Sequence, residues 1–180
     1  MNKTFFVFAF VLATLACLNS QTQAAPKWPI HSGAWFDVQY PPGFAARRVH
    51  QTWAAVEDKY DAAFFSAPDK SVEFYVYSPQ WNGEPTEMAL LPRREVLVSQ
   101  QTRRREWGRD FNGEIVHRVV ARWFTARAKD GSYWRSWLDI EDVGIGTRKT
   151  FGIKYRDHKA YARYKFACLR FKNSLDQHGD

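Results

Sequence analysis

The sequence predicts an α+β fold: an antiparallel sheet of about six strands with a C-terminal helix packed on one face. Three observations lead to this prediction. Short segments of alternating apolar and polar residues stop at Pro or Gly, as strands do. Two long alternating runs flank Asp130-Gly131, a favoured hairpin turn. Near the C-terminus the apolar residues recur at three- and four-residue spacing instead, which indicates a helix.

The N-terminus has the pattern of an export signal. After a single lysine, residues 4–18 carry no charge, and a polar spacer then leads to the small residue Ala24. We expect residues 1–24 to be a signal peptide and residues 25–180 to form a single domain, periplasmic or secreted. A loose lipoprotein box around Cys17 leaves a lipid-anchored form as the alternative.

Removing the signal also changes the charge and the cysteine content. Loss of Lys3, its one charged residue, lowers the formal net charge from +7 to +6. Cys168 then remains alone, so no disulfide can form within the chain. The remaining chain is long enough to bury a core without such cross-links, and we expect no transmembrane helix in it.

The expected strands each end at a turn signal. The first ends at Pro41-Pro42-Gly43, and the third places Val72, Phe74 and Val76 on one face. Apart from the hairpin, the predicted strands are 35–40, 61–66, 72–78, 95–101 and 148–155.

The hairpin over 114–140 allows a prediction of register. If Asp130 and Gly131 form a two-residue loop, Lys129 and Ser132 are partners and every other pair follows. One face then becomes mostly apolar, and the other face joins residues of opposite charge or similar shape. The predicted pairs are Ala121 with Ile140, Arg122 with Asp139, Trp123 with Leu138, Phe124 with Trp137, and Arg127 with Trp134.

The C-terminal helix is expected to begin after Asp157, a good N-cap residue. Its apolar stripe must pack on something, and the sheet is the available partner. The stripe consists of Tyr161, Tyr164, Cys168, Phe171 and Leu175.

The two ends of the chain resemble PsbP-like domains. The strand and Pro-Gly turn of residues 36–44 are similar to the opening of that family, which also finishes with a helix like the one expected here. The resemblance implies a central antiparallel sheet flanked by helices, and an accessory or binding role. It carries no site residues over to this chain.

Catalytic signatures are weak in this sequence. The five histidines show no metal-ligand spacing, and no cofactor motif occurs, so we predict neither a metal nor a cofactor. Cys168 lies in the helix stripe, where a buried, inert thiol is the ordinary interpretation. Asp139 and Glu141 share a strand face, as paired catalytic acids do, but an ion pair from Asp139 to Arg122 is the simpler interpretation.

Basic residues near aromatic ones are the main functional signal. Arginines lie on both sides of a tryptophan just before the hairpin, a composition that binds anions and rings, although export makes nucleic acid an unexpected partner. The alternative is a solvated basic edge that prevents strand aggregation. Trp81, in a loop of turn residues, is either a contact anchor or a cover for the sheet end. The candidate binding residues are Trp81, Arg103, Arg104, Arg105, Trp107 and Arg109.

These patterns predict an exported, non-enzymatic envelope protein that binds a macromolecular or anionic partner through a basic aromatic surface. The partner would be an envelope protein or an anionic envelope surface. One alternative is a small secreted hydrolase that uses Asp139 or Glu141 with His50. Another is an inhibitor or immunity-type protein, which the sequence does not separate from the first prediction.

Overall fold

The computed structural model describes residues 26–49, 61–79 and 88–178. The predicted signal peptide, Cys17, His50 and Trp81 lie outside these ranges. The described elements are β1 (Ile30–Ser32), β2 (Phe36–Gln39), β3 (Ala45–Val49), β4 (Ala62–Ser66), β5 (Val72–Tyr77), β6 (Glu95–Arg109), β7 (Ile115–Ala128), β8 (Trp134–Asp142), β9 (Thr147–Tyr155), α1 (His158–Asn173) and β10 (Asp176–Gln177).

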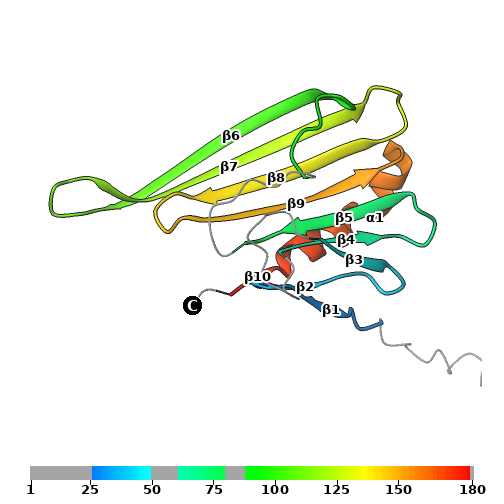
Figure 1. Cartoon of the computed structure of the whole chain (residues 1–180), viewed down its shortest axis with the longest axis horizontal. Helices are drawn as coiled ribbons and strands as arrows, with labels where there is room; N and C mark the ends of the chain where they lie inside the picture. Colours follow the sequence, from blue (N-terminus) through cyan, green and yellow to red (C-terminus); the bar gives the residue numbers. More distant parts are fainter. Residues whose placement is uncertain (1–25, 50–60, 80–87, 179–180) are drawn as a thin grey trace, which may run out of the picture.

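The main sheet has seven antiparallel strands in the order β3-β4-β5-β9-β8-β7-β6 (Figure 1). The predicted α+β class, with a mostly antiparallel sheet and a closing helix, is therefore confirmed. The first predicted strand does not join this sheet. It is β2, which lies between β1 and β10 in a separate sheet of three short strands.

The helix and the small sheet cover one face of the main sheet, which we call the helix face. Phe74 from β5, Phe171 from α1 and Phe36 from β2 are each at most 1% exposed and belong to one apolar cluster. Burial of each such ring stabilises the fold by about 1.5–3 kcal/mol. The predicted N-cap holds the helix start, because Asp157 accepts a 2.8 Å hydrogen bond from the backbone of Ala160. The terminal helix therefore lies on the sheet, as its stripe predicts.

The other side of the sheet, which we call the opposite face, carries a second apolar cluster. Phe64, Tyr75 and Trp137 are buried there beside Met88, which precedes β6. The sheet is therefore buried on both sides near its centre.

The predicted register of the hairpin is confirmed, since all five expected pairs occur between β7 and β8. The two-residue loop is wrong. The last backbone hydrogen bond before the turn runs from the Ala128 amide to the Tyr133 carbonyl, over 2.9 Å. The Lys129 amide donates to the Arg94 carbonyl and not to Ser132. Asp130 accepts from the backbone of Ser132, which closes a wider turn. A contact from a distant segment thus determines how this turn is closed.

Strand β6 is much longer than the predicted strand 95–101, and it continues through the arginine run to Arg109. Its pairing with β7 shifts by one residue between Leu97 and Ser99, so a β-bulge interrupts the alternation of faces. The prediction failed here because the polar run lacks the apolar alternation by which strands are recognised.

Candidate functional site

The outer ends of β6 and β7 form a two-stranded arm. The pairing of β7 with β8 ends at Val119, whereas its pairing with β6 continues to Ile115. Figure 1 shows this end of the hairpin projecting beyond the turn between β8 and β9. We define the arm as residues 103–121. Its inner part, up to the pair of Arg105 with Val119, still lies beside β8, and its outer part extends past β8. Every residue of that outer part, 106–118, is exposed or half-buried.

The β-bulge determines which arginines share a face of the arm. Beyond the bulge, the odd-numbered residues of β6 lie opposite odd-numbered residues of β7, on the side of the sheet that carries the helix. Arg103, Arg105, Trp107 and Arg109 are therefore together on that side. Arg104 points to the other side. The structure thus brings four of the five described candidate residues together and separates the fifth.

Aromatic rings on the same face hold these cations. The Arg105 guanidinium lies 5.3 Å from the centre of the Trp107 ring, and that of Arg103 lies 5.7 Å from the Trp123 ring. Trp107 in turn stacks on His117, with 5.3 Å between ring centres and 16° between ring planes. These are cation–π distances, and they keep charge and ring surface side by side. Trp107 is 42% exposed, so it can still contact a partner.

His117 and Trp123 add to the site in different ways. The apolar strand pattern favours a core position for His117, but the arm lies outside the core and the ring is only half-buried against Trp107. Trp123 was placed on the correct face by the register, but it was missed as a candidate site residue. No sequence signal identified Trp123, because only the pairing of β6 with β7 brings Arg103 to its ring.

The other side of the arm has its charge partly neutralised. Arg118 donates to Glu106 over 2.7 Å, and both side chains are well exposed. Arg104 lies next to this pair along β6, on the same side. A pair this exposed contributes little to stability, but it cancels one positive charge. The positive charge therefore dominates on the side of Arg103 and Arg105.

Two turns at this end of the sheet, that of the arm and that between β8 and β9, present apolar side chains to solvent. Phe111, in the turn between β6 and β7, is 96% exposed, and the Asp110 carboxylate accepts two backbone hydrogen bonds that close this turn. Ile145, in the turn between β8 and β9, is 64% exposed. A Cβ atom added at Gly144 would lie 2.5 Å from the Val116 carbonyl oxygen, so the second turn touches the arm. Both apolar side chains therefore lie at the same end of the sheet.

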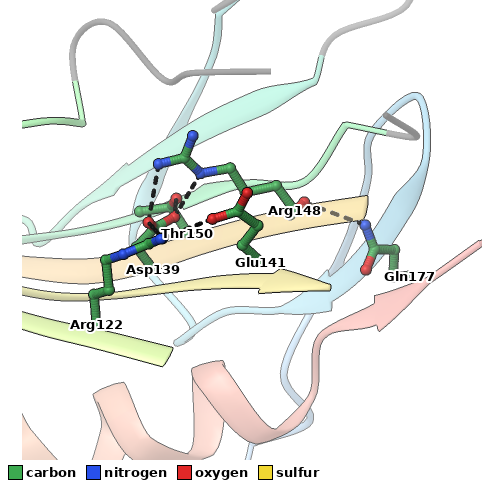
Figure 2. A network of polar contacts seen from close by, with 6 residues as sticks. All are labelled: Arg122, Asp139, Glu141, Arg148, Thr150 and Gln177. Carbon is green, nitrogen blue, oxygen red and sulfur yellow. Dashed lines mark hydrogen bonds and ion pairs between the residues drawn. The ribbon is translucent and has the colours of Figure 1, made fainter. Parts of the chain in front are cut away.

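A network of ion pairs holds the strands from which the arm projects (Figure 2). Asp139 on β8 accepts two bonds from Arg148 on β9, of 2.7 and 2.9 Å, and a third of 3.0 Å from Thr150. Arg122 on β7 reaches Asp139 at 3.3 Å and Glu141 at 2.9 Å. The predicted ion pair between Arg122 and Asp139 is confirmed, but Arg148, which the sequence prediction missed, makes the shorter contacts.

This arrangement bears on the predicted alternative, a hydrolase. Asp139 is only 4% exposed and its two oxygens are occupied by Arg148, Thr150 and Arg122. A general acid or base needs a proton that can reach substrate, and this carboxylate has no such access. Its expected partner, His50, lies outside the described residues. The network therefore favours the ion-pair interpretation of the acidic pair.

Cys168 is half-buried in α1, as its place in the stripe predicts. Burial raises the pKa of its thiol to about 12, and Lys172 opposes this shift only in part. A nucleophilic cysteine needs the reverse, a thiolate stabilised by nearby positive charge.

In the described ranges no three His, Cys, Asp or Glu residues gather as metal ligands, and no helix is long and apolar enough to span a membrane.

Comparisons with known proteins give likenesses in structure only. No family model matches the chain, and no curated protein matches its sequence. Among solved structures it is similar to cyanobacterial PsbP from Synechocystis, with 11% identity and a TM-score of 0.48 over 89% of this chain and 99% of that one. It is also similar to the Ran-binding protein Mog1p from Saccharomyces cerevisiae, with 8% identity and a TM-score of 0.36 over 85% and 97% of the two chains. The resemblance to PsbP-like domains is thus confirmed at the level of fold, and no function follows from it.

Proposed function

We propose that this chain is an exported, non-enzymatic protein that binds an anionic envelope surface through the helix-face side of its arm. One observation carries the proposal: Arg103, Arg105 and Arg109 share a face with Trp107 on a strand pair that projects from the sheet. Cations ordered against rings attract anionic groups and also offer apolar contact area.

The exposed apolar side chains of the two turns at this end of the sheet favour a lipid surface over an acidic protein as the partner. Phe111 and Ile145 are both largely exposed at the end of the sheet to which the arm belongs. Exposed apolar side chains flanked by arginine are the combination that binds the interface of an anionic bilayer. Each cation near such a surface contributes about 1 kcal/mol of attraction, which falls as salt rises.

Sedimentation with vesicles tests the proposal. Residues 25–180 are mixed with vesicles of phosphatidylglycerol or of phosphatidylcholine, and the bound fraction is measured. The test variant is Arg103→Glu with Arg105→Glu, and the control is Arg104→Glu with Arg118→Glu, which makes the same change in net charge on the other side of the arm. We expect binding to anionic vesicles alone, a loss of at least about tenfold in the test variant, and a clearly smaller loss in the control.

Equal losses in the two double variants would show that net charge, and not this face of the arm, controls binding. Absence of binding to anionic vesicles would refute the lipid surface as partner. Capture of an envelope protein by the unaltered chain, lost in the test variant and kept in the control, would then assign the same face to a protein partner.

A further inference from the structure

A second site lies at the other end of the sheet, away from the arm. It is a hollow of about 1060 Å³ on the opposite face, between the strands β4, β5 and β9 and two bordering segments. Segment 91–95 forms one border and the turn at 128–133 forms the other. The size is that of a small-molecule site.

Positive charge predominates in this hollow. Five cationic side chains line its outer part: Arg47, Arg93, Arg94, Lys129 and Lys154. Among the described residues, no carboxylate lies within ion-pair distance of any of them. Two of the carboxylates in the lining are engaged by hydroxyl groups: Glu73 accepts from Ser66 over 2.9 Å, and Asp130 accepts from Ser132 over 2.6 Å. Like charges gathered in a concave site repel one another, and an anion held between them relieves that repulsion.

The floor of the hollow is built from a buried ion pair. Arg135, 4% exposed, donates to Glu95 over 2.7 Å and to the Ala89 carbonyl over 2.6 Å. The Tyr133 hydroxyl donates to the other Glu95 oxygen over 3.0 Å, and burial together with this bond raises the pKa of Tyr133. The Glu95 charge is thereby neutralised by Arg135 within the protein, so the outer cations determine the charge that a ligand meets.

Aromatic rings position some of these cations. The Lys154 ammonium lies 4.5 Å from the centre of the Tyr133 ring, and the Arg47 guanidinium lies 4.4 Å from that of Phe64. Tyr75, which is buried, completes the ring-lined part of the hollow. The site therefore combines positive charge with flat apolar surface.

We propose that this hollow binds a small organic phosphate that carries an aromatic ring. The phosphate lies between the Arg94, Lys129 and Lys154 side chains, where a planar guanidinium and two ammonium groups supply donors and charge. The ring lies against the accessible part of Tyr133, because Phe64 is 6% exposed and the Arg47 guanidinium lies over its ring. Phosphate is favoured over a single carboxylate because several cations line the hollow and a dianion neutralises more of them. This proposal rests on residues separate from the arm and is independent of the proposed function.

Calorimetric titration of the full chain tests the proposal, with adenosine monophosphate as the probe and adenosine and inorganic phosphate as comparison compounds. The test variant is Arg94→Glu with Lys129→Glu. The control is Lys159→Glu, an exposed lysine of α1 that does not line the hollow. We expect saturable binding of adenosine monophosphate, weaker binding of inorganic phosphate and none of adenosine. We expect the test variant to bind at least about tenfold more weakly and the control to match the unaltered chain.

Folding is checked with the same samples, and independence is checked with the same substitutions made in residues 25–180, which the vesicle assay uses. Unchanged urea unfolding of the test variant shows that the loss is not a loss of structure, and Arg94→Gln with Lys129→Gln replaces it if the first pair unfolds. The test variant should still bind anionic vesicles, and Arg103→Glu with Arg105→Glu should still bind adenosine monophosphate. Absence of saturable binding up to about 10 mM, or equal binding by the test variant and the unaltered chain, would overturn the proposal.

Discussion

Substitution of Glu95 by Gln provides a strong test of the packing on the opposite face. The Glu95 carboxylate accepts from Arg135 at 2.7 Å, from the Leu91 backbone at 3.0 Å and from the Tyr133 hydroxyl at 3.0 Å. Gln has nearly the same shape, and its carbonyl oxygen can still accept one of these bonds. It leaves the Arg135 charge without compensation, and the side chains of this pair are 0% and 5% exposed.

Removing one member of a buried pair costs about 3–5 kcal/mol of unfolding free energy. With a urea dependence of about 2 kcal/mol per molar, a loss of 4 kcal/mol lowers the unfolding midpoint by about 2 M. The matched control is Glu106→Gln, which removes the partner of the exposed Arg118 and should cost about 0–1 kcal/mol. Adding Arg135→Met to the first variant should restore part of the loss, because no buried charge then remains uncompensated.

Urea unfolding followed by tryptophan fluorescence measures these differences. Equal midpoints for the Glu95 and Glu106 variants would refute the reasoning, since they would show that burial of the pair has no energetic consequence. A further loss on adding Arg135→Met would show that Arg135 stabilises this face mainly by its other contacts, among them the bond to the Ala89 carbonyl.

Two further predictions concern the sheet centre and the helix. Gly152→Ala places a Cβ atom 2.5 Å from the buried Tyr75 ring and hydroxyl, so it should lower the unfolding free energy by about 1–3 kcal/mol. A loss below about 0.5 kcal/mol would contradict this packing. In a Cys17→Ser background, Cys168 should react with iodoacetamide at pH 8 about a thousandfold more slowly in the native protein than in urea, because its pKa is raised from 9.0 to about 12. The native rate should continue to rise above pH 11, whereas a half-maximal rate near pH 9 would show an ordinary thiol.

The hairpin register was predictable because its pairing obeys a local rule. Alternation with a period of two places Trp123 and Leu138 on one face and Arg122 and Asp139 on the other, and a shift by one residue would exchange the two sets. The helix start at Asp157 was predictable for a similar reason, since the cap and the stripe lie within a few turns of each other.

Other elements depend on contacts that local patterns do not contain. Strands β1, β3 and β10 have two to five residues and were not predicted. β1 and β10 pair with β2, and β3 pairs with β4, so each depends on a partner strand. The outer part of β6 is polar apart from Trp107 and Gly108, and it pairs with β7 along its length. At the turn around Asp130, the Lys129 amide donates to the carbonyl of Arg94, which is distant in sequence, and not to Ser132.

In the candidate site, too, local patterns predicted one part and contacts between distant segments decided the other. The sequence alone identified the arginines and Trp107 as a cluster of charge and ring. The bulge between Leu97 and Ser99 decided that Arg103 and Arg105 face Trp107 while Arg104 does not. A bulge moves every later side chain to the other face, and it is chosen by the packing of both strands together.

By itself, then, the sequence determined the fold class, the hairpin register and the chemical character of the surface, because these follow from side chains a few positions apart. Only the tertiary structure decided the second sheet, the partners of Asp139 and the hollow at Arg94 and Lys129. Those features join segments far apart in the chain, and their positions depend on how the whole core packs.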